Sequence, residues 1–190
     1  MAIMAGIDYS LSCPAIVIYD DKLDLCFENV NVYFRSNQAR FELFKEGNIN
    51  GENHKPFKCD MDRYDDIGNW AISILDDHGV KKAFLEGYSF GSTGRVFNIA
   101  ENTAILKYNL WDRYIDTTIV PPTTIKKYAT GKGNANKEKM YEAFCNENSK
   151  TQLKEMLTPR AARVISPVSD IVDAYYIAVS YTHLTLPTKA

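Results

Sequence analysis

Three segments at the start of the chain show the patterns of apolar and polar residues that β-strands produce. Residues 3–9 alternate with the two-residue period of a half-buried strand. Residues 15–19 form an apolar run rich in β-branched residues, and the turn-like residues 20–22 follow it. Residues 25–34 provide a third strand. We expect these segments to form an antiparallel meander of three strands.

The next part of the chain changes from this pattern to a helical one. Residues 35–60 show no periodicity and are rich in Asn, Gly, Lys and Glu, so we predict an insertion or loop without regular structure. The apolar residues between Ile67 and Leu75 then recur at the spacing of one helical face. Gly79 is placed to end this helix.

The remaining segments predict strand–helix units. Residues 83–86 are a short apolar run of the kind found in buried strands, and they end at Glu86 before a glycine-rich loop at residues 87–94. A helix, a strand and three further helices are predicted after that loop: residues 96–110, residues 115–120, residues 123–129, a segment from Lys137 and a segment from about Ser169. The predicted fold class is therefore α/β, with a mixed five-stranded sheet flanked by helices, in which three strands form the antiparallel meander and two are parallel.

Length and composition are those of one globular domain. With 190 residues, of which 45% are hydrophobic, the chain can form one sizeable core, and we assign residues 1–178 to it. No run of about 18 apolar residues is present, so no membrane span is expected. The four cysteines are scattered without a C-x-x-C pair, which favours reduced thiols in a cytosol-like compartment over disulfides or a zinc site. A net charge of −2 argues against a surface coated by nucleic acid but allows a local basic strip.

The last residues match a translated sequence that is foreign to the domain. Residues 179–188 are the in-frame translation of a DNA sequence that resembles the end of a transposon-type sequencing adaptor. We therefore expect residues 179–190 to be a non-native tail on a truncated natural chain, although a genuine polar tail is the alternative. Such a tail is not expected to pack against the core.

Four acidic residues occupy positions that are unusual for a carboxylate. Asp8 ends an apolar strand, and Glu86 ends another before the glycine-rich loop. Asp170 and Asp173 lie three residues apart in a predicted helix, so their carboxylates share one face. Each position also has an ordinary explanation: strand ends favour solvated turn formers, and acids are favoured in the first turn of a helix, here with Ser169 as its N-cap.

Taken together, the acids indicate a metal site. Carboxylates are the hard oxygen donors that Mg²⁺ and Mn²⁺ select, and a site that cuts phosphodiesters needs several of them from separate elements. Two ions about 3.5–4 Å apart would activate a water molecule and stabilise the leaving oxygen. Histidines and cysteines are too few for the alternative ligand sets.

These motifs, in this order, resemble those of the RuvC family of Holliday-junction resolvases. The matching segments are Gly6-Ile7-Asp8, Leu85-Glu86, Asp170-Ile171-Val172-Asp173-Ala174, and the stretch of residues 125–137, which is similar to a V-K-x-x-x-x-G-x-G-x-A-x-K segment of the family. The resemblance covers most of residues 3–178. It implies that Asp8, Glu86, Asp170 and Asp173 are metal ligands, and that Lys126 and Lys137 serve DNA binding and catalysis.

The resemblance also implies a fold, an activity and partners. It predicts an RNase H-like domain that acts as a homodimer and cuts four-way DNA junctions with Mg²⁺ or Mn²⁺, because a symmetric junction needs two opposed cuts. The insertion at residues 35–60 and extra residues at about 146–166 are similar to the longer spacings of phage-type relatives. For a phage-encoded enzyme the expected compartment is the cytoplasm of the bacterial host.

The lysine segment and the glycine-rich loop provide candidates for DNA contact. Five lysines crowd around two glycines that would let the backbone approach a phosphate: Lys126, Lys127, Lys132, Lys137 and Lys139. A solvated run of charge is the alternative, and the spacing excludes a nucleotide P-loop. Tyr88, Phe90 and Arg95 could stack on unpaired bases, with core packing or a plain linker as the alternative. The family's junction-opening aromatic aligns with Ser89, so that role has moved or been lost.

Two other functions share some of these features. Actin- and hexokinase-like ATPase domains have the same fold and a first strand similar to residues 6–10, but they need a second phosphate loop and a second domain, for which this length leaves little room. A junction-binding module that does not cleave would tolerate the loss of one acid, whereas all four are present.

Overall fold

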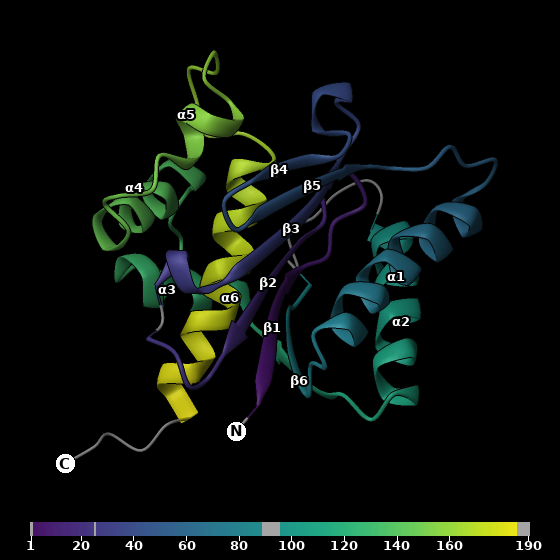
Figure 1. The fold of residues 1–190 in the computed structure, drawn as a ribbon. Coiled ribbons are helices and arrows are strands. Elements are labelled where there is room, and N and C mark those ends of the chain that lie inside the picture. The colour runs from purple at the N-terminus through teal and green to yellow at the C-terminus, as the bar shows by residue number, and fades with distance from the viewer. Residues whose placement is uncertain (1, 25, 89–95, 186–190) are drawn as a thin grey trace.

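The computed structural model describes residues 2–24, 26–88 and 96–185, with side chains up to residue 180. The strands in this part of the chain form one mixed sheet in the order β4-β5-β3-β2-β1-β6-β7 (Figure 1). Their bounds are Ile3–Asp8 for β1, Ala15–Asp20 for β2, Asn31–Ser36 for β3, Phe44–Glu46 for β4, Ile49–Asn53 for β5, Lys82–Glu86 for β6 and Asp116–Val120 for β7.

Helices cover both faces of the sheet. On one face lie α1 and α2, with bounds Asp60–Asp77 and Val96–Asp112 (Figure 1). The other face carries α6, Val168–Thr185, with three shorter helices around it: α3 (Pro122–Thr130), α4 (Lys137–Glu147) and α5 (Leu153–Leu157). Two short 3-10 turns, η1 and η2, span Phe27–Asn29 and Ala39–Phe41.

The five predicted strands are confirmed and lie side by side in the order β3-β2-β1-β6-β7, with β7 at one edge of the sheet. β3, β2 and β1 pair antiparallel, and β6 and β7 continue the sheet from β1 in parallel. The third strand begins later than predicted, at Asn31, because the 3-10 turn η1 precedes it. Gly79 follows α1 with a φ of +64°, the left-handed conformation expected at the end of a helix. α5 was not predicted, because it is only five residues long.

The prediction of an unstructured insertion at residues 35–60 is wrong. β5 pairs in parallel with β3, and β4 pairs antiparallel with β5, so the sheet has seven strands among the described residues rather than five. These strands lie at the edge of the sheet, where few residues meet the core, so they show no apolar alternation. β4 contacts the core through an aromatic ring: that of Phe44 lies 6.2 Å from the Phe34 ring and 5.6 Å from the Phe41 ring.

Side chains of the central strands divide between two cores. Those on one face of β1 and β6, such as Ile7 and Leu85, pack with α1 and α2. Those on the other face, such as Phe84, pack with α6 and its neighbours. Ile7 and Leu85 face α1 and α2. Because strand residues alternate between faces, the next residues, Asp8 and Glu86, face α6 instead.

Gly6 allows α6 to lie directly against β1. A Cβ atom at this position would be 2.7 Å from the Ala178 Cβ and would also collide with the backbone at Ala174. Ala174 and Ala178 are themselves small and fully buried. This close approach places Asp170, one turn before Ala174, over the end of β1 that carries Asp8.

The helix α6 continues through the point where the foreign tail is predicted to begin. Val179 and Ser180 are buried within it. The side chains from Tyr181 onward lie outside the described residues. All four cysteines are free. In the described part of the chain, no helix combines the length and apolarity needed to cross a membrane.

Replacing Gly6 with Ala should separate α6 from β1. The added methyl group meets backbone atoms that cannot move without shifting the helix, so the free energy of unfolding should fall by about 1–3 kcal/mol. Urea denaturation followed by circular dichroism measures this loss.

Gly68→Ala is the matched control for this substitution. Gly68 lies inside α1, and a Cβ atom there would have only ordinary contacts, the nearest at 3.6 Å. Alanine favours a helix over glycine by up to about 1 kcal/mol, so this variant should be as stable as the original chain or more so. Equal destabilisation by both substitutions would contradict the close-approach interpretation.

Candidate active site

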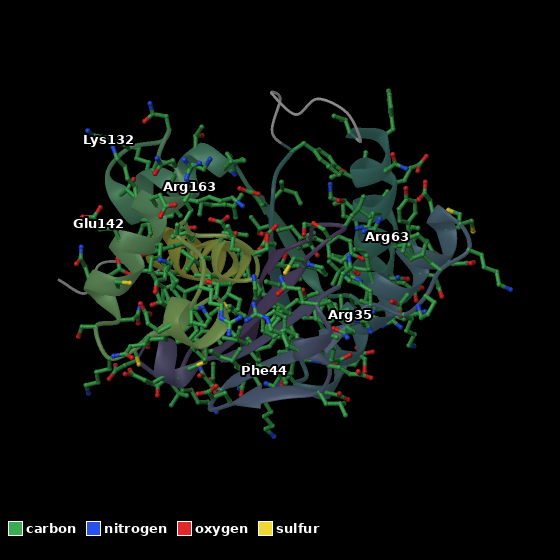
Figure 2. All side chains as sticks on the ribbon, turned by 90° about the horizontal axis from the view of Figure 1, so that it is seen from above. Arg35, Phe44, Arg63, Lys132, Glu142 and Arg163 are labelled. Atoms are coloured by element: carbon green, nitrogen blue, oxygen red, sulfur yellow. The ribbon has the colours of Figure 1, made fainter. Side chains whose placement is uncertain are left out.

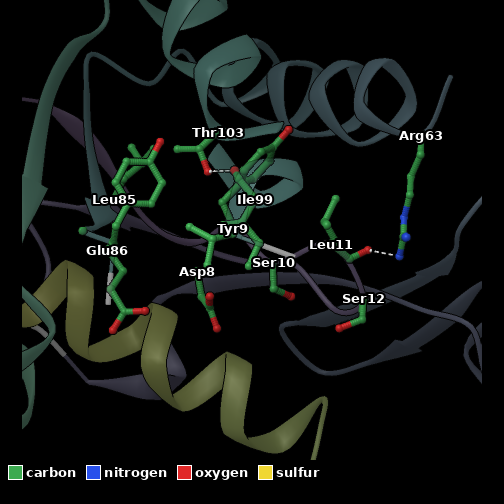
Figure 3. Close-up of a pocket in the computed structure, with 13 residues that line it drawn as sticks. Asp8, Tyr9, Ser10, Leu11, Ser12, Arg63, Leu85, Glu86, Ile99 and Thr103 are labelled. Atoms are coloured by element: carbon green, nitrogen blue, oxygen red, sulfur yellow. Dashed lines mark hydrogen bonds between the residues drawn. The ribbon is translucent and has the colours of Figure 1, made fainter. Parts of the chain in front are cut away.

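The four predicted acids lie at one end of the sheet, on the side that α6 covers. Asp8 and Glu86 are the last residues of β1 and β6, and the pairing of Ile7 with Leu85 places these two strand ends side by side. Their carboxylates point toward α6 (Figure 3). Asp170 and Asp173 lie in the first two turns of that helix.

Burial and mutual repulsion raise the pKa values of these acids. Burial raises the pKa of Asp8 most, and the charges of Asp170, Asp173 and Glu86 raise it further. Asp173 reaches a pKa of about 7, because of its burial and the charges of Glu86 and Asp170. Burial is also the main cause of the raised pKa values of Asp170 and Glu86. The carboxylates therefore form one electrostatic cluster.

Hydroxyl groups beside Asp170 hold its carboxylate in place. The Ser169 Oγ donates to the Asp170 Oδ2 at 3.2 Å, and Ser166 also bonds this carboxylate and lowers its pKa. Ser169 is not the N-cap that the sequence suggested, because α6 begins one residue earlier, at Val168. The buried Cys13 thiol also bonds Asp170. The loop between β1 and β2 carries it there, and no local motif indicates it.

Two of the predicted lysines accompany the acids. Lys137 is the first residue of α4, and its Nζ donates to the Ser169 Oγ at 3.1 Å. Its positive charge lowers the pKa values of Asp8, Asp170 and Asp173. The charge of Lys126, in α3, lowers those of Glu86 and Asp173.

Gly131 and Asn136 shape the turn that connects Lys126 in α3 with Lys137 in α4. Gly131 ends α3 with a φ of +76°, and its N–H donates to the Lys127 carbonyl at 2.8 Å. Asn136 caps α4, because its side-chain oxygen accepts a hydrogen bond from the Lys139 N–H at 3.0 Å. One helix therefore ends at Gly131 and the next begins after Asn136, with a short turn between them.

The other predicted DNA-binding residues that the structure describes are exposed. Lys127 and Lys132 are exposed, and Lys132 lines a separate groove with Lys139 and Glu142 (Figure 2). Tyr88 is 45% exposed, and the Lys107 Nζ lies 4.9 Å from the centre of its ring. Tyr88 and Lys126 line one groove of about 570 Å³ beside Glu86. Ser89, Phe90 and Arg95 lie outside the described residues.

The carboxylates suit a hard divalent cation by their chemistry. Four carboxylates with their charges repelling one another are oxygen donors of the kind that Mg²⁺ and Mn²⁺ bind. Among the described residues, however, no group of three His, Cys, Asp or Glu side chains has the arrangement of a preformed metal site. The cluster therefore provides the ligands but not a closed coordination shell.

The fold is similar to that of several solved resolvases. No protein-family model matches the sequence, and no curated protein does. RuvC of Thermus thermophilus bound to a Holliday junction substrate is 13% identical, with a TM-score of 0.61, over 96% of this chain and 93% of RuvC. The fowlpox virus resolvase in complex with Holliday junction DNA is 13% identical, with a TM-score of 0.55, over 97% of this chain and 99% of that one.

The yeast mitochondrial Holliday junction resolvase Ydc2 is also similar, with 15% identity and a TM-score of 0.53 over 94% of this chain and 76% of Ydc2. The chain has the RNase H-like fold of these resolvases. This confirms the predicted fold class, with two strands more than expected at the edge of the sheet. Within the RNase H-like fold, the acids come from the ends of two central strands and from the helix that covers them.

The stability of the metal-free protein should fall as the pH rises. The folded pKa of Asp173 is raised above its ordinary value of 3.8 to about 7, so the protonated form favours the folded state. This contribution is complete below about pH 4 and is lost as the pH rises through 7. Urea denaturation at a series of pH values, with a chelator present, should show the decline.

Asp173→Asn should reduce this decline and make the protein more stable than the original chain at pH 8, because the amide carries no charge. Asp65→Asn, at an exposed position of α1, is the control and should leave the pH profile unchanged. A profile that Asp173→Asn does not alter would contradict the assignment of a raised pKa to this residue.

Proposed function

We propose that this chain is a structure-selective, metal-dependent endonuclease that cuts phosphodiester bonds in Holliday junctions. The observation that carries the proposal is the cluster of four carboxylates, with Lys126 and Lys137 beside it, at one end of an RNase H-like sheet. Solved proteins of similar fold are resolvases bound to junction DNA, which supports the same substrate here.

The proposed cofactor is Mg²⁺, with Mn²⁺ as a substitute, bound as two ions by Asp8, Glu86, Asp170 and Asp173. Such ions would make a water molecule nucleophilic at neutral pH and stabilise the leaving oxygen. The repulsion among the carboxylates favours this proposal, because a bound cation would relieve it and lower their raised pKa values.

The chain's own residues would orient the phosphate. Lys137 is exposed at the start of α4, and its ammonium group donates to Ser169, which in turn donates to Asp170. It can therefore contact a phosphate oxygen at the edge of the acidic cluster and balance negative charge there. Lys126 approaches the cluster from the side of Glu86.

The DNA would follow the groove that Tyr88 and Lys126 line beside Glu86. Lys127 and Lys132 would contact phosphates farther along the arm, so the basic strip is local, in keeping with a net charge of −2. Tyr88 is placed to stack on an unpaired base. The free cysteines are consistent with a reducing compartment such as the cytoplasm, that of the bacterial host if the chain is phage-encoded.

A homodimer is supported by an apolar stripe on the outer face of α2. Phe97, Ala104, Tyr108 and Trp111 follow one another at spacings of seven, four and three residues, which is the spacing of a helix–helix seam. Phe97 is 83% exposed and Trp111 71%. A second copy of α2 would cover the stripe and supply the opposed cut.

Sedimentation velocity should show that the chain is a dimer. Trp111→Glu should dissociate it, because the charge would be buried in the seam. Leu43→Glu changes an exposed residue between η2 and β4, away from α2, and should leave the dimer intact.

Asp8→Asn and Glu86→Gln should each reduce junction cutting by about 100-fold or more. Each removes a charged ligand but keeps the shape of the side chain. Binding should survive, because it depends mainly on phosphate contacts. Gel-shift and cleavage assays on a mobile four-way junction, with Mg²⁺ and with a chelator, measure both properties.

The control for these variants is again Asp65→Asn, which should cut normally. If either active-site variant cuts at the original rate, the metal-site assignment is wrong. If the original chain binds the junction and never cuts it with Mg²⁺ or Mn²⁺, the chain is a binding module rather than a nuclease.

Lys126→Ala and Lys137→Ala should each weaken junction binding and reduce its salt dependence. Each lost phosphate contact lowers the slope of log K against log salt by about one unit. Lys45→Ala removes an exposed charge from β4, at the far edge of the sheet, and should leave the slope unchanged. An unaltered slope in both test variants would mean that these lysines do not contact the DNA.

A further inference from the structure

A third groove, of about 670 Å³, lies between the two segments that lengthen the spacings between the motifs, residues 35–60 and about 146–166. One wall is Arg40, in the 3-10 turn η2, and the other is the connection between α5 and α6. We propose that this arginine groove binds the sugar–phosphate backbone of a second arm of the branched DNA. The inference depends on the proposed nuclease function and names the part of the substrate that this surface would hold.

The arginine groove is positively charged. Arg40 and Arg160 line it and are exposed, and Arg163 adds a third exposed guanidinium on the same connection (Figure 2). Across the described part of the chain, none of the three forms an ion pair with an acid, and no acidic side chain lines the groove. Arginine offers N–H donors in a planar fork that matches two phosphate oxygens. A phosphate backbone is therefore the partner that the charge and the donors fit.

Local contacts hold Arg40 before any DNA binds. Its guanidinium carbon lies 4.4 Å from the centre of the Phe41 ring, and its Nε donates to the Gln38 Oε1 at 3.0 Å. Phe41 is itself buried and packs edge-on against Phe34, with the ring centres 5.0 Å apart. Neither contact of Arg40 uses the N–H bonds of its Nη atoms, which can donate to a phosphate. Because the side chain is already ordered, binding loses less conformational entropy.

A turn presents Arg160 on the other wall. The Ala161 N–H donates to the Thr158 carbonyl at 3.0 Å, so Pro159 and Arg160 occupy the two corners of a four-residue turn. Proline favours the first corner, because its ring fixes the φ angle that this position needs. Thr158 is buried and anchors the turn, whereas Pro159 and Arg160 are exposed. The local sequence therefore holds this guanidinium at the surface of the groove.

Strand pairing places the arginine groove at the end of the sheet that carries the acids. Asp8 pairs with Ala15, and Ala15 pairs with Phe34, two residues before β3 ends. η2 begins three residues after β3 ends. Arg40 therefore lies at the same end of the sheet as Asp8.

The other wall leads directly to the acids. Ile165 lines the groove, and the next residue, Ser166, bonds the Asp170 carboxylate. The Val164 N–H donates to the Glu138 Oε1 at 3.0 Å, which joins the same connection to the first turn of α4. A phosphate in the groove would therefore be held by the segment that also positions Asp170.

The arginine groove and the groove that Tyr88 and Lys126 line are on opposite sides of β1. In the sheet, β2, β3 and β5 lie to one side of β1, and β6 and β7 lie to the other. The second of these grooves includes Gly87 and Ile119, from the ends of β6 and β7. Four strand spacings of about 4.8 Å separate β3 from β7, so the strand ends that carry the two grooves are roughly 20 Å apart. Two arms that diverge from a branch could each occupy one groove, with the branch over the acids.

Hydroxyl-radical footprinting of a four-way junction tests this placement. Without Mg²⁺, the original chain should protect the backbone of both arms that meet at each cleaved phosphate. The double substitution Arg40→Ala with Arg160→Ala should remove the protection of one arm of each pair and keep that of the other, because each groove holds its own arm. Lys126→Ala should instead weaken the protection of the other arm.

The matched control removes two positive charges from the opposite end of the sheet. Lys22 and Lys81 are both exposed near Ile3, where β1 begins. Lys22→Ala with Lys81→Ala should leave the footprint and the salt dependence of junction binding unchanged. The double arginine variant should lower the slope of log K against log salt by about two units, one for each lost phosphate contact.

Separate outcomes address the arginine groove and the nuclease function. A double arginine variant that protects every arm as the original chain does, or loses protection evenly from all arms, would overturn the second-arm site and leave the nuclease standing. So would a variant that changes only the sedimentation of the free chain, because the groove would then be an interface between copies. A chain that neither binds nor cuts the junction would overturn the proposed function and this inference with it.

Discussion

The contact between α6 and β1 is the constraint on which the site depends. Gly6 has no side chain, and Ala174 and Ala178 have the smallest ones, so the helix axis lies unusually near the strand. A helix held farther away would move Asp170 and Asp173 away from Asp8 and Glu86 and weaken the electrostatic interaction among the four acids. Gly6 therefore affects the distance between the α6 carboxylates and Asp8, which lies two residues farther along the same face of β1.

Holding the four carboxylates close together raises the free energy of the folded state when they are ionised, and other groups of the site offset part of this increase. Burial raises the pKa values of all four carboxylates, and the neighbouring acids raise those of Asp8 and Asp173 further, so the folded state is favoured when these groups are protonated. Hydroxyl donors at Asp170 and the two lysines relieve part of the repulsion. A cluster that remains strained in the absence of cations is well suited to bind them, because binding and the relief of repulsion favour the same state.

The sequence predicts the centre of this molecule better than its edges. The central strands and the long helices have enough buried residues to show a period, and the four acids stand out because each interrupts an apolar segment. β4 and β5 bury few side chains, so their sequence looks like a loop. The spacing of the lysine segment, matched to the family pattern, already distinguishes Lys126 from Lys132, and the structure agrees: the charge of Lys126 acts on Glu86 and Asp173, whereas Lys132 lines another groove. No local motif indicates Cys13, which reaches Asp170 through a loop.

The end of β1 also organises features that no motif records. Because consecutive side chains point to opposite faces, Asp8 faces α6 and Tyr9 faces the side of α1 and α2. The end of this strand therefore contributes to both the acidic cluster and a neighbouring cavity of about 380 Å³. The helix α2 is divided in the same manner: Ile99 and Thr103 face the cavity, while Tyr108 and Trp111 are exposed on another face. A second copy covering the exposed face would therefore leave the cavity open.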